Sequence, residues 1–349
     1  MDKYFLMDKD TPVLSFACTM RSGSYLFDLV DLISPNHLPP YLKRNQNNLG
    51  DMLMVYLFSR LMSDAREFRR EAMNDLNLHY LEWWPLLLTG KGTSLNDSYW
   101  IKSAHDEATW SRISPYTNPL DLRLADLFLL GESGQERTGI SPEMTTQGML
   151  AKAWVKEEGN TFLVKRGSFG YANAGREPFV ECMVVAIGDF LGIPMATQDL
   201  SQYAGHVVTK SPNFTSEATS FVEAVHYVVD LEPNQWTYEA LVEIFDDRAD
   251  IARSLVNMQL LDYLTHNTDR HWRNFGFLVD NQTKEVIGQS PLYDQGYALY
   301  HSAMAQYDNP FDFGDLSQVI GPTKGSDLLD HLKAHLAKEM VGRLEGLYR

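Results

Sequence analysis

The chain is poor in cysteine, has no long apolar run and carries few positive charges for its size. Its 349 residues include two cysteines, Cys18 and Cys182, and neither has a second cysteine or a histidine at ligand spacing. We therefore predict reduced thiols and neither a disulfide framework nor a structural zinc site. No apolar stretch reaches the roughly 20 residues that cross a bilayer, and residues 1–6 lack the basic start of a secretory signal. A globular, cytoplasmic protein with no membrane partner is expected.

The shortage of basic residues limits the class of partner. Asp and Glu number 46 against 30 Lys and Arg, which gives a formal net charge of −16 at pH 7. Such a charge repels phosphate backbones, so nucleic acid is not expected as a direct partner. A bound nucleotide remains compatible with it, because salt screens distant surface charge beyond about 8–10 Å.

A polar, glycine-containing stretch at residues 131–139 is the best linker candidate. Because a chain of this length holds about two or more domains, we place a boundary there. We predict an α/β region of unclear role over residues 1–138, a strand-rich lobe over residues 139–215 and a mainly helical lobe over residues 216–349.

Local patterns divide the N-terminal region further. Residues 5–16 predict two short strands about a turn, residues 99–102 a strand and residues 120–130 a helix. Apolar spacing predicts one helix from Leu49 to about residue 70. Its run of mixed charge at residues 66–71 is interpreted as a solvated helix face rather than a phosphate-binding patch.

A hairpin and a helix follow the linker. Residues 145–155 and 161–165 predict two strands joined by a Glu-Gly-Asn turn, with Lys165 ending the second strand. Residues 177–191 predict a helix that carries Glu181 and ends at a glycine. A strand is predicted at residues 206–210, then mostly helix over residues 216–264, and last an amphipathic core helix over residues 326–348.

The densest group of polar residues lies at positions 266–274, between a helical pattern and a probable strand. This short turn holds Asp269, His271 and Asn274, and Asp294 follows a second strand. An amide and two carboxylates on separate segments suit Mg²⁺, which prefers oxygen ligands and needs few from the protein. A rival interpretation takes His266, Asp269 and His271 as ligands of a transition metal.

Phosphoryl transfer requires a loop over the phosphates, a strand lysine paired with a helix glutamate, a carboxylate facing the acceptor and oxygen ligands for magnesium. The sequence offers these parts in that order. They are Gly148, Lys165, Glu181, Asp269, Asn274 and Asp294. In this setting the sequence Asn-Thr-Asp-Arg-His-Trp-Arg-Asn-Phe-Gly, with Leu-Tyr-Asp downstream, resembles the HipA-like serine/threonine kinases, including CtkA-like kinases, and more remotely phosphatidylinositol-3-kinase-type enzymes.

The resemblance covers roughly residues 140–349 and implies an α+β, two-lobed, protein-kinase-like fold with an N-terminal α/β extension. It implies that Asp269 is the catalytic carboxylate, with His271 supporting its loop. It implies that ATP is bound by six residues: Lys165, Glu181, Thr146, Gly148, Val208 and Lys210. It implies that Mg²⁺ is bound by Asn274 and Asp294.

The activity implied is transfer of the γ-phosphate of ATP to Ser or Thr of a protein substrate. Self-phosphorylation is implied too, and Thr145 and Thr146 are the hydroxyls nearest the expected loop. A regulatory or antitoxin-like protein partner belongs to the same expectation, with the N-terminal region as a docking surface by family analogy. A lipid or small-molecule kinase and a nucleotide-binding pseudokinase remain alternatives. The phosphate loop contains Gly148 as its only glycine, and Gly-x-Gly and Asp-Phe-Gly motifs are missing.

Overall fold

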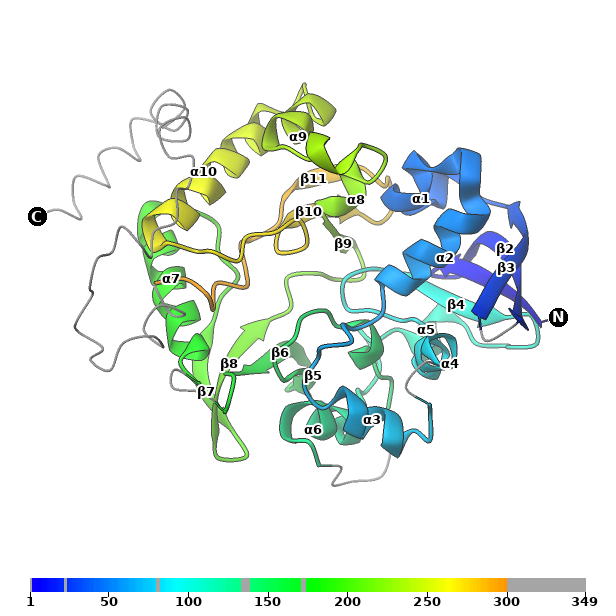
Figure 1. The fold of residues 1–349 in the computed structure, drawn as a ribbon, viewed down its shortest axis with the longest axis horizontal. Helices are drawn as coiled ribbons and strands as arrows, with labels where there is room; N and C mark the ends of the chain where they lie inside the picture. The colour runs from blue at the N-terminus through cyan, green and yellow to red at the C-terminus, as the bar shows by residue number, and fades with distance from the viewer. Residues whose placement is uncertain (1, 22–23, 80–81, 133–138, 171–173, 300–349) are drawn as a thin grey trace, which may run out of the picture. The chain divides into compact units, whose positions relative to one another are not determined.

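Contacts within the chain define two compact units, each assembled from separate stretches of sequence. Figure 1 labels their helices and strands. We describe them from a computed structural model, which describes residues 2–21, 24–79, 82–132, 139–170 and 174–299. The first unit comprises Met1–Lys165, Pro212–Gln235 and Phe277–Ile287, and the second comprises Arg166–Ser211, Trp236–Gly276 and Gly288–Arg349.

An antiparallel sheet in the strand order β3-β2-β1-β4 begins the first unit. Leu6 of β1 lies opposite Leu14 of β2 and Ile101 of β4. Directly opposite residues share a face of the sheet, and all three of these are buried. The strands predicted within residues 5–16 and at residues 99–102 are confirmed. The observed bounds are β1 (Asp2–Asp8), β2 (Thr11–Arg21), β3 (Ser24–Leu32) and β4 (Tyr99–Ser103).

Short helices accompany this sheet in the first unit. The predicted helix at residues 120–130 is confirmed as α6, which Asp121 caps by accepting from the Leu124 amide at 3.2 Å. It ends at Gly131, whose φ of 79° is left-handed and favours glycine. The helices are α1 (Pro40–Arg44), α2 (Leu49–Ser59), α3 (Arg69–Asp75), α4 (Trp83–Thr89), α5 (Trp110–Ile113) and α6 (Leu122–Leu130), with 3-10 turns η1 (Pro35–His37) and η2 (Gln46–Asn48).

The single helix predicted from Leu49 to about residue 70 is wrong. α2 ends at Ser59, and α3 begins only after Phe68, whose φ of 60° is left-handed. The solvated face predicted for residues 66–71 is wrong for Arg66 and Arg69, which are each only 3% exposed, and is confirmed for Arg70 and Glu71, which are exposed. Charged side chains this deeply buried need partners, and Glu143, the partner of Arg66, lies far along the sequence. A local charge pattern does not reveal such a pair.

The predicted hairpin is confirmed, but its first strand begins later than expected. β5 (Lys152–Glu157) pairs with β6 (Asn160–Arg166) in antiparallel register. Glu158 and Gly159 form the turn with φ of 49° and 84°, the left-handed pair that tight hairpins require. The predicted strand at residues 145–151 is wrong. η3 (Glu143–Thr145) and an irregular stretch stand there instead.

The second unit contains the predicted helix, α7 (Glu177–Leu191), with the expected bounds. It ends at Gly192, whose φ is 72°. The strand predicted at residues 206–210 is confirmed as β8 (His206–Pro212), which forms a hairpin with β7 (Asp199–Tyr203). The predicted elements α7 and β8 could be recognised from a terminal glycine and from apolar spacing, because both signals lie within the element's own sequence.

The remaining elements lead to the polar turn. The prediction of mostly helix over residues 216–264 is confirmed from residue 225 onward, but it misses a strand at the start of this stretch, β9. This strand belongs to a sheet of order β11-β10-β9. The elements are β9 (Thr219–Glu223), α8 (Val225–Val228), η4 (Pro233–Gln235), α9 (Tyr238–Ile244), α10 (Ala249–Thr265), β10 (Gly276–Asp280) and β11 (Val286–Gln289).

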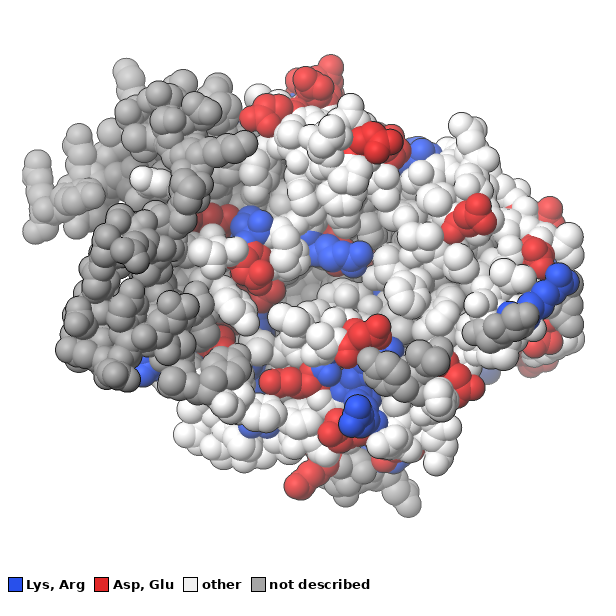
Figure 2. Space-filling view, viewed as in Figure 1, with Lys and Arg blue, Asp and Glu red and all other residues white. Residues whose placement is uncertain are grey.

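Two sequence predictions fall outside the described residues. They are most of the linker at residues 131–139 and the helix at residues 326–348. The domain boundaries placed after residues 138 and 215 stay predictions. Within the described part of the chain, no helix combines the length and apolarity needed to span a membrane, and both cysteines are free. On the face drawn in Figure 2, basic side chains lie in small groups beside acidic ones.

Candidate functional site

The polar turn at residues 266–274 is fixed at its start by the end of α10. His266 follows the helix in a left-handed conformation with φ of 50°. The Asn267 side chain then donates to Asp262 Oδ1 at 3.0 Å and to Gln295 Oε1 at 2.9 Å, while its own oxygen accepts from the Asp269 amide at 3.1 Å. The main chain at Asp269 is therefore anchored both to the helix and to the segment around Gln295.

Arg270 joins the turn to the segment that carries Asp294. Its Nε and Nη2 donate to the two oxygens of Asp262 at 2.9 Å and 3.0 Å. Its Nη1 donates to the carbonyl of Asn274 and, at 3.2 Å, to the carbonyl of Tyr293. The side chain is almost fully buried. Burial lowers the pKa of this guanidinium, but Asp262, with Tyr293 and Asp294, raises it, and the net shift is upward.

Asn274 turns back onto the residue predicted to be catalytic. Its Nδ2 donates to the Asp269 carbonyl at 2.8 Å, and its amide donates to the His271 carbonyl at 2.8 Å. Because the amide nitrogen is used in this way, Oδ1 is the atom of this buried side chain that can accept a hydrogen bond or bind a cation. The turn thus brings Asp269 and Asn274 into direct contact.

His271 lies on the exposed side of the turn. Its Nδ1 accepts from the Arg273 amide at 3.2 Å. This bond stabilises the turn, which is the kind of support that the sequence predicts for this residue. Whether His271 also takes part in the chemistry stays a prediction.

Asp294 has a left-handed backbone, with φ of 58°. Non-glycine residues adopt this region rarely and hold it where neighbours fix the chain. Tyr293 does so on one side, since its hydroxyl donates to the Arg273 carbonyl at 2.7 Å. Gln295 does so on the other, since its oxygen accepts from Asn267. Asp294 therefore occupies a fixed position beside the turn.

Glu181 of α7 packs against Gly296, two residues after Asp294. A Cβ built on Gly296 would lie 3.4 Å from Glu181 Oε1. Glu181 is buried and accepts from the Thr209 hydroxyl at 3.2 Å. Its neighbour Glu177 accepts from the Ser168 amide at 3.1 Å. In the second unit, α7 and the segment after Asp294 therefore form one polar, buried region.

A family model, the HipA-like C-terminal domain, matches residues 144–343. The chain belongs to this family. The ten residues assigned from the sequence all lie inside the HipA-like segment, and residues 1–143 precede it.

Two solved structures are similar to the chain. HipA of Shewanella oneidensis MR-1, solved with HipB and its operator DNA, has a TM-score of 0.57 at 11% identity, with 98% of this chain and 87% of that chain covered. CtkA of Helicobacter pylori, a proinflammatory kinase, has a TM-score of 0.37 at 20% identity, with 51% of this chain and 62% of that chain covered. No curated protein matches. The HipA comparison shows the fold, a mixed α/β arrangement with several antiparallel sheets, and the two-lobed arrangement stays a prediction.

Lys165 of the HipA-like segment is buried near the end of β6. Lys152 lies directly opposite it in register and is buried too. Side chains of opposite residues share a face, so two lysines stand side by side. Sequence reasoning missed Lys152, although counting back from the Glu-Gly-Asn turn gives this pairing. The predicted contact between Lys165 and Glu181 stays a prediction.

The first residues of the predicted nucleotide loop are buried, whereas Met149 is exposed. Thr145 and Thr146 are buried. The Thr145 hydroxyl lies 2.8 Å from the Thr93 carbonyl, and Thr146 Oγ1 accepts from the Trp154 indole at 3.0 Å. Phosphorylation of either hydroxyl would first have to displace the segment. Gly148 does adopt the left-handed φ of 97° that favours glycine, and the space of a Cβ there is taken by Lys152 Nζ.

The last predicted nucleotide residues lie on β8. Val208 is buried, Lys210 is half-buried, and the two share a face of the strand because they are two residues apart. Thr209 points to the other face, where it meets Glu181. Among the described residues, no group of three His, Cys, Asp or Glu side chains is arranged to hold a metal ion. The rival site of His266, Asp269 and His271 is therefore not formed.

Arg270 is the other residue of the HipA-like domain that sequence reasoning missed. The available signal was its place between Asp269 and His271, eight residues after Asp262 at the end of a predicted helix. Such spacing is common, so chemistry alone did not distinguish a structural arginine from a surface one.

Proposed function

We propose that this HipA-like protein is an ATP- and Mg²⁺-dependent kinase that transfers the γ-phosphate to serine or threonine hydroxyls of a protein. The observation that carries the proposal is Arg270, which fastens the turn of Asp269 and Asn274 to the segment of Asp294. Phosphoryl transfer depends on positioning and charge neutralisation more than on covalent chemistry. Oxygen-bearing side chains fixed on two segments meet that requirement.

The donor set suits magnesium. Asn274 Oδ1 and the Asp294 carboxylate are hard oxygen ligands, and Mg²⁺ takes few ligands from the protein. When bound, the ion would neutralise charge on the phosphate oxygens. Asn274 is held by its own hydrogen bond to the Asp269 carbonyl, and the main chain beside Asp294 is held by the bond from the Tyr293 hydroxyl to the Arg273 carbonyl. Neither bond involves a metal ion.

The remaining roles follow from charge and placement. Asp269 would accept the proton of the attacking hydroxyl. Lys165 would hold the phosphates, with buried Glu181 as its predicted partner, and Lys152 adds a second ammonium on the same face of the hairpin. Val208 and Lys210 would lie toward the adenine. Gly148 would let the main chain approach the phosphates.

A protein partner is part of the proposal. The similar HipA was solved with HipB and DNA, and on that basis we propose a regulatory, antitoxin-like protein partner for this chain. Adding such a partner should suppress the phosphorylation that the isolated protein performs. Unchanged labelling at a saturating concentration of the partner would reject its inhibitory role.

Labelled ATP with Mg²⁺ tests the activity. We expect transfer to protein, and Asp269→Asn should lower its rate by about 10²–10⁴-fold, the usual contribution of a general base. Asp247→Asn, a change at an exposed carboxylate, is the matched control and should retain the wild-type rate. Full labelling by a folded Asp269→Asn variant would reject the assigned role. Nucleotide binding without transfer would indicate a pseudokinase, and label in phosphoinositides would indicate a lipid kinase.

A further inference from the structure

The arginine whose burial contradicts the sequence prediction contacts the segment before β5. The Arg66 guanidinium donates to Glu143 Oε2 at 3.1 Å, to the Thr146 carbonyl at 2.6 Å and to the Lys152 carbonyl. It also stacks over the Phe128 ring, 4.5 Å from its centre. One side chain therefore binds the main chain on both sides of residues 147–151, which we call the 147–151 loop.

Neighbours of Arg66 hold the loop itself. The Glu67 amide donates to the Met149 carbonyl at 2.8 Å, and its carboxylate accepts from the Ala151 amide at 2.9 Å. From the loop, Gln147 Nε2 donates to the carbonyls of Ser59 and Leu61 at 3.1 Å and 2.7 Å. We call residues 59–67 the tether segment. It lies outside the residues that match the HipA-like family model.

The carboxylate of Glu143 completes this arrangement. Its Oε1 accepts from the Trp154 amide of β5 at 2.7 Å, while Oε2 accepts from Arg66. Both charged side chains are almost completely buried. A buried ion pair is costly to desolvate and persists where its hydrogen bonds are well satisfied. Here those bonds fix the start of β5 and the main chain before the loop.

We propose that the tether segment is the scaffold of the 147–151 loop, and that Arg66 is its positioning residue. By holding the carbonyls of Thr146 and Lys152, Arg66 fixes the backbone at Gly148 and the starting point of the Lys152 side chain. These are the groups that would face the phosphates of a nucleotide, so the inference rests on the proposed function. The N-terminal region thereby sets nucleotide affinity without touching the nucleotide.

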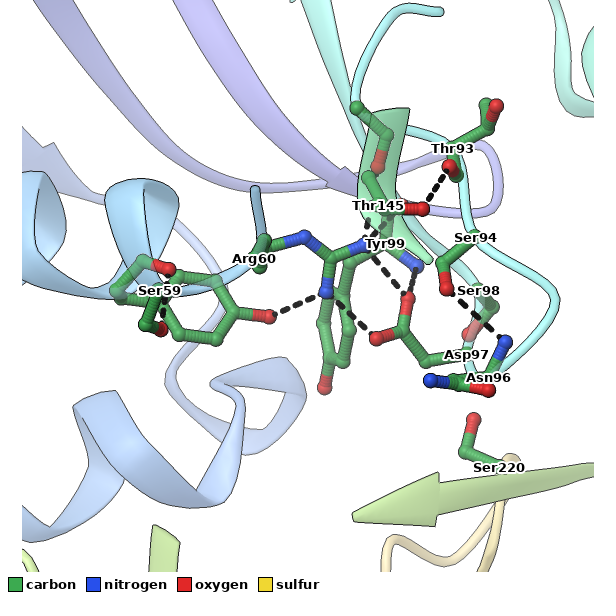
Figure 3. A network of polar contacts seen from close by, with 12 residues as sticks. Ser59, Arg60, Thr93, Ser94, Asn96, Asp97, Ser98, Tyr99, Thr145 and Ser220 are labelled. Atoms are coloured by element: carbon green, nitrogen blue, oxygen red, sulfur yellow. Dashed lines mark hydrogen bonds and ion pairs between the residues drawn. The ribbon is translucent and has the colours of Figure 1, made fainter. Parts of the chain in front are cut away.

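Arg66→Met is the direct test, and Arg60→Met is its matched control. Arg60 belongs to the same tether segment and is also mostly buried, with its side chain 8% exposed. Its guanidinium binds Asp97 at 2.6 Å (Figure 3) and the Gly92 carbonyl at 3.0 Å, and not the 147–151 loop. Both changes remove a buried arginine from an ion pair. Only the first releases the 147–151 loop.

Two measurements on the full chain are needed. Hydrogen exchange of the amides of residues 147–151, without nucleotide, should become about tenfold faster or more in Arg66→Met, and stay near wild type in Arg60→Met. The KM for MgATP should rise by about tenfold or more in Arg66→Met with a smaller change in kcat, because misplacement of a binding group is costly. Equal exchange in the two variants, or an unchanged KM in Arg66→Met, would overturn the proposal.

The two proposals fail in different ways. A wild-type protein that binds no MgATP rejects the kinase, whereas the exchange comparison still decides the scaffold role. If Arg66→Met does not fold, Gln147→Ala replaces it, because this change keeps the buried ion pair and removes only the bonds to Ser59 and Leu61. Faster exchange at residues 148–151 supports the scaffold, and wild-type exchange there overturns it.

Discussion

Arg270 and Arg248 both bind a carboxylate through two hydrogen bonds, but in different surroundings. Arg270 binds Asp262 at 2.9 Å and 3.0 Å, and Arg248 binds Asp250 at 2.9 Å and 2.8 Å. The side chains of the first pair are 5% and 11% exposed, and those of the second 29% and 59%. Geometry alone does not separate them. Loss of one partner leaves a buried charge only in the first pair.

Arg270→Met should therefore lower the free energy of unfolding by about 3–5 kcal/mol. Arg248→Met, the control, should lower it by less than about 1 kcal/mol, because water and salt screen an exposed pair. Urea unfolding of both variants measures the difference. Equal losses of unfolding free energy in the two variants would show that the buried Arg270–Asp262 pair stabilises the protein no more than the exposed Arg248–Asp250 pair.

Glu143 predicts a dependence of stability on pH. Burial raises its pKa from the ordinary value of 4.5 to about 7, although Arg66 and the Trp154 amide lower it. Because the folded pKa lies above the unfolded one, this group stabilises fully below about 4.5, and the contribution is lost as the pH rises through about 7.

Unfolding of wild type and Glu143→Gln at several pH values tests this. The glutamine does not titrate, so wild type should lose stability relative to the variant as the pH rises through about 7. A difference between the two proteins that stays constant with pH would show that Glu143 does not titrate there.

At the scale of elements, the β5–β6 hairpin gives an independent test of phosphate binding. Lys152 and Lys165 lie opposite each other, and their side chains share one face of the hairpin. Under the proposed function, both ammonium groups would face the phosphates of the nucleotide. Lys152→Met should therefore reduce the rise in melting temperature that MgATP produces, while the protein without nucleotide stays folded.

The control for this change is Lys156→Met on the same strand. Lys156 donates to the carbonyls of Tyr116 and Asn118 at 2.8 Å each, so its loss should lower the melting temperature without changing the MgATP-dependent rise. Scanning calorimetry measures both quantities. A full rise in Lys152→Met would remove Lys152 from the nucleotide site.

The elements that were predictable have local causes. α7 shows its apolar stripe and its terminal glycine in the sequence itself, and the β5–β6 hairpin shows its turn. The break between α2 and α3 was not predictable from the sequence. Apolar spacing continues from Leu49 toward residue 70, whereas the observed chain places Arg66 in an ion pair with the distant Glu143. For the candidate site, side-chain chemistry and the family resemblance select Asp269, Asn274 and Asp294, and their roles stay predictions. The role of Arg270 depends on burial, which spacing did not reveal, whereas the place of Lys152 follows from the register that the predicted turn sets.

At the scale of the whole molecule, the family match begins at residue 144, but the first unit does not divide there. Trp154 of β5 packs in one cluster with Leu95 and Leu120. Arg66 adds a buried ion pair to Glu143, and Lys156 is held by carbonyls of residues 115–118. Apolar, ionic and hydrogen-bonding contacts thus all cross the predicted boundary after residue 138.

Residues 139–349 expressed alone should therefore fail to fold cooperatively. Removing residues 1–138 exposes Trp154 and deprives Glu143 of its partner Arg66. Losing one partner of a buried pair costs about 3–5 kcal/mol. This is a large part of the total stability of a typical protein, which is about 5–15 kcal/mol. Circular dichroism during heating would show a broad transition where the full chain shows a sharp one. A truncated protein that melts sharply and binds MgATP with full-length affinity would mean that the N-terminal region is a separate module, and the boundary after residue 138 would then be correct.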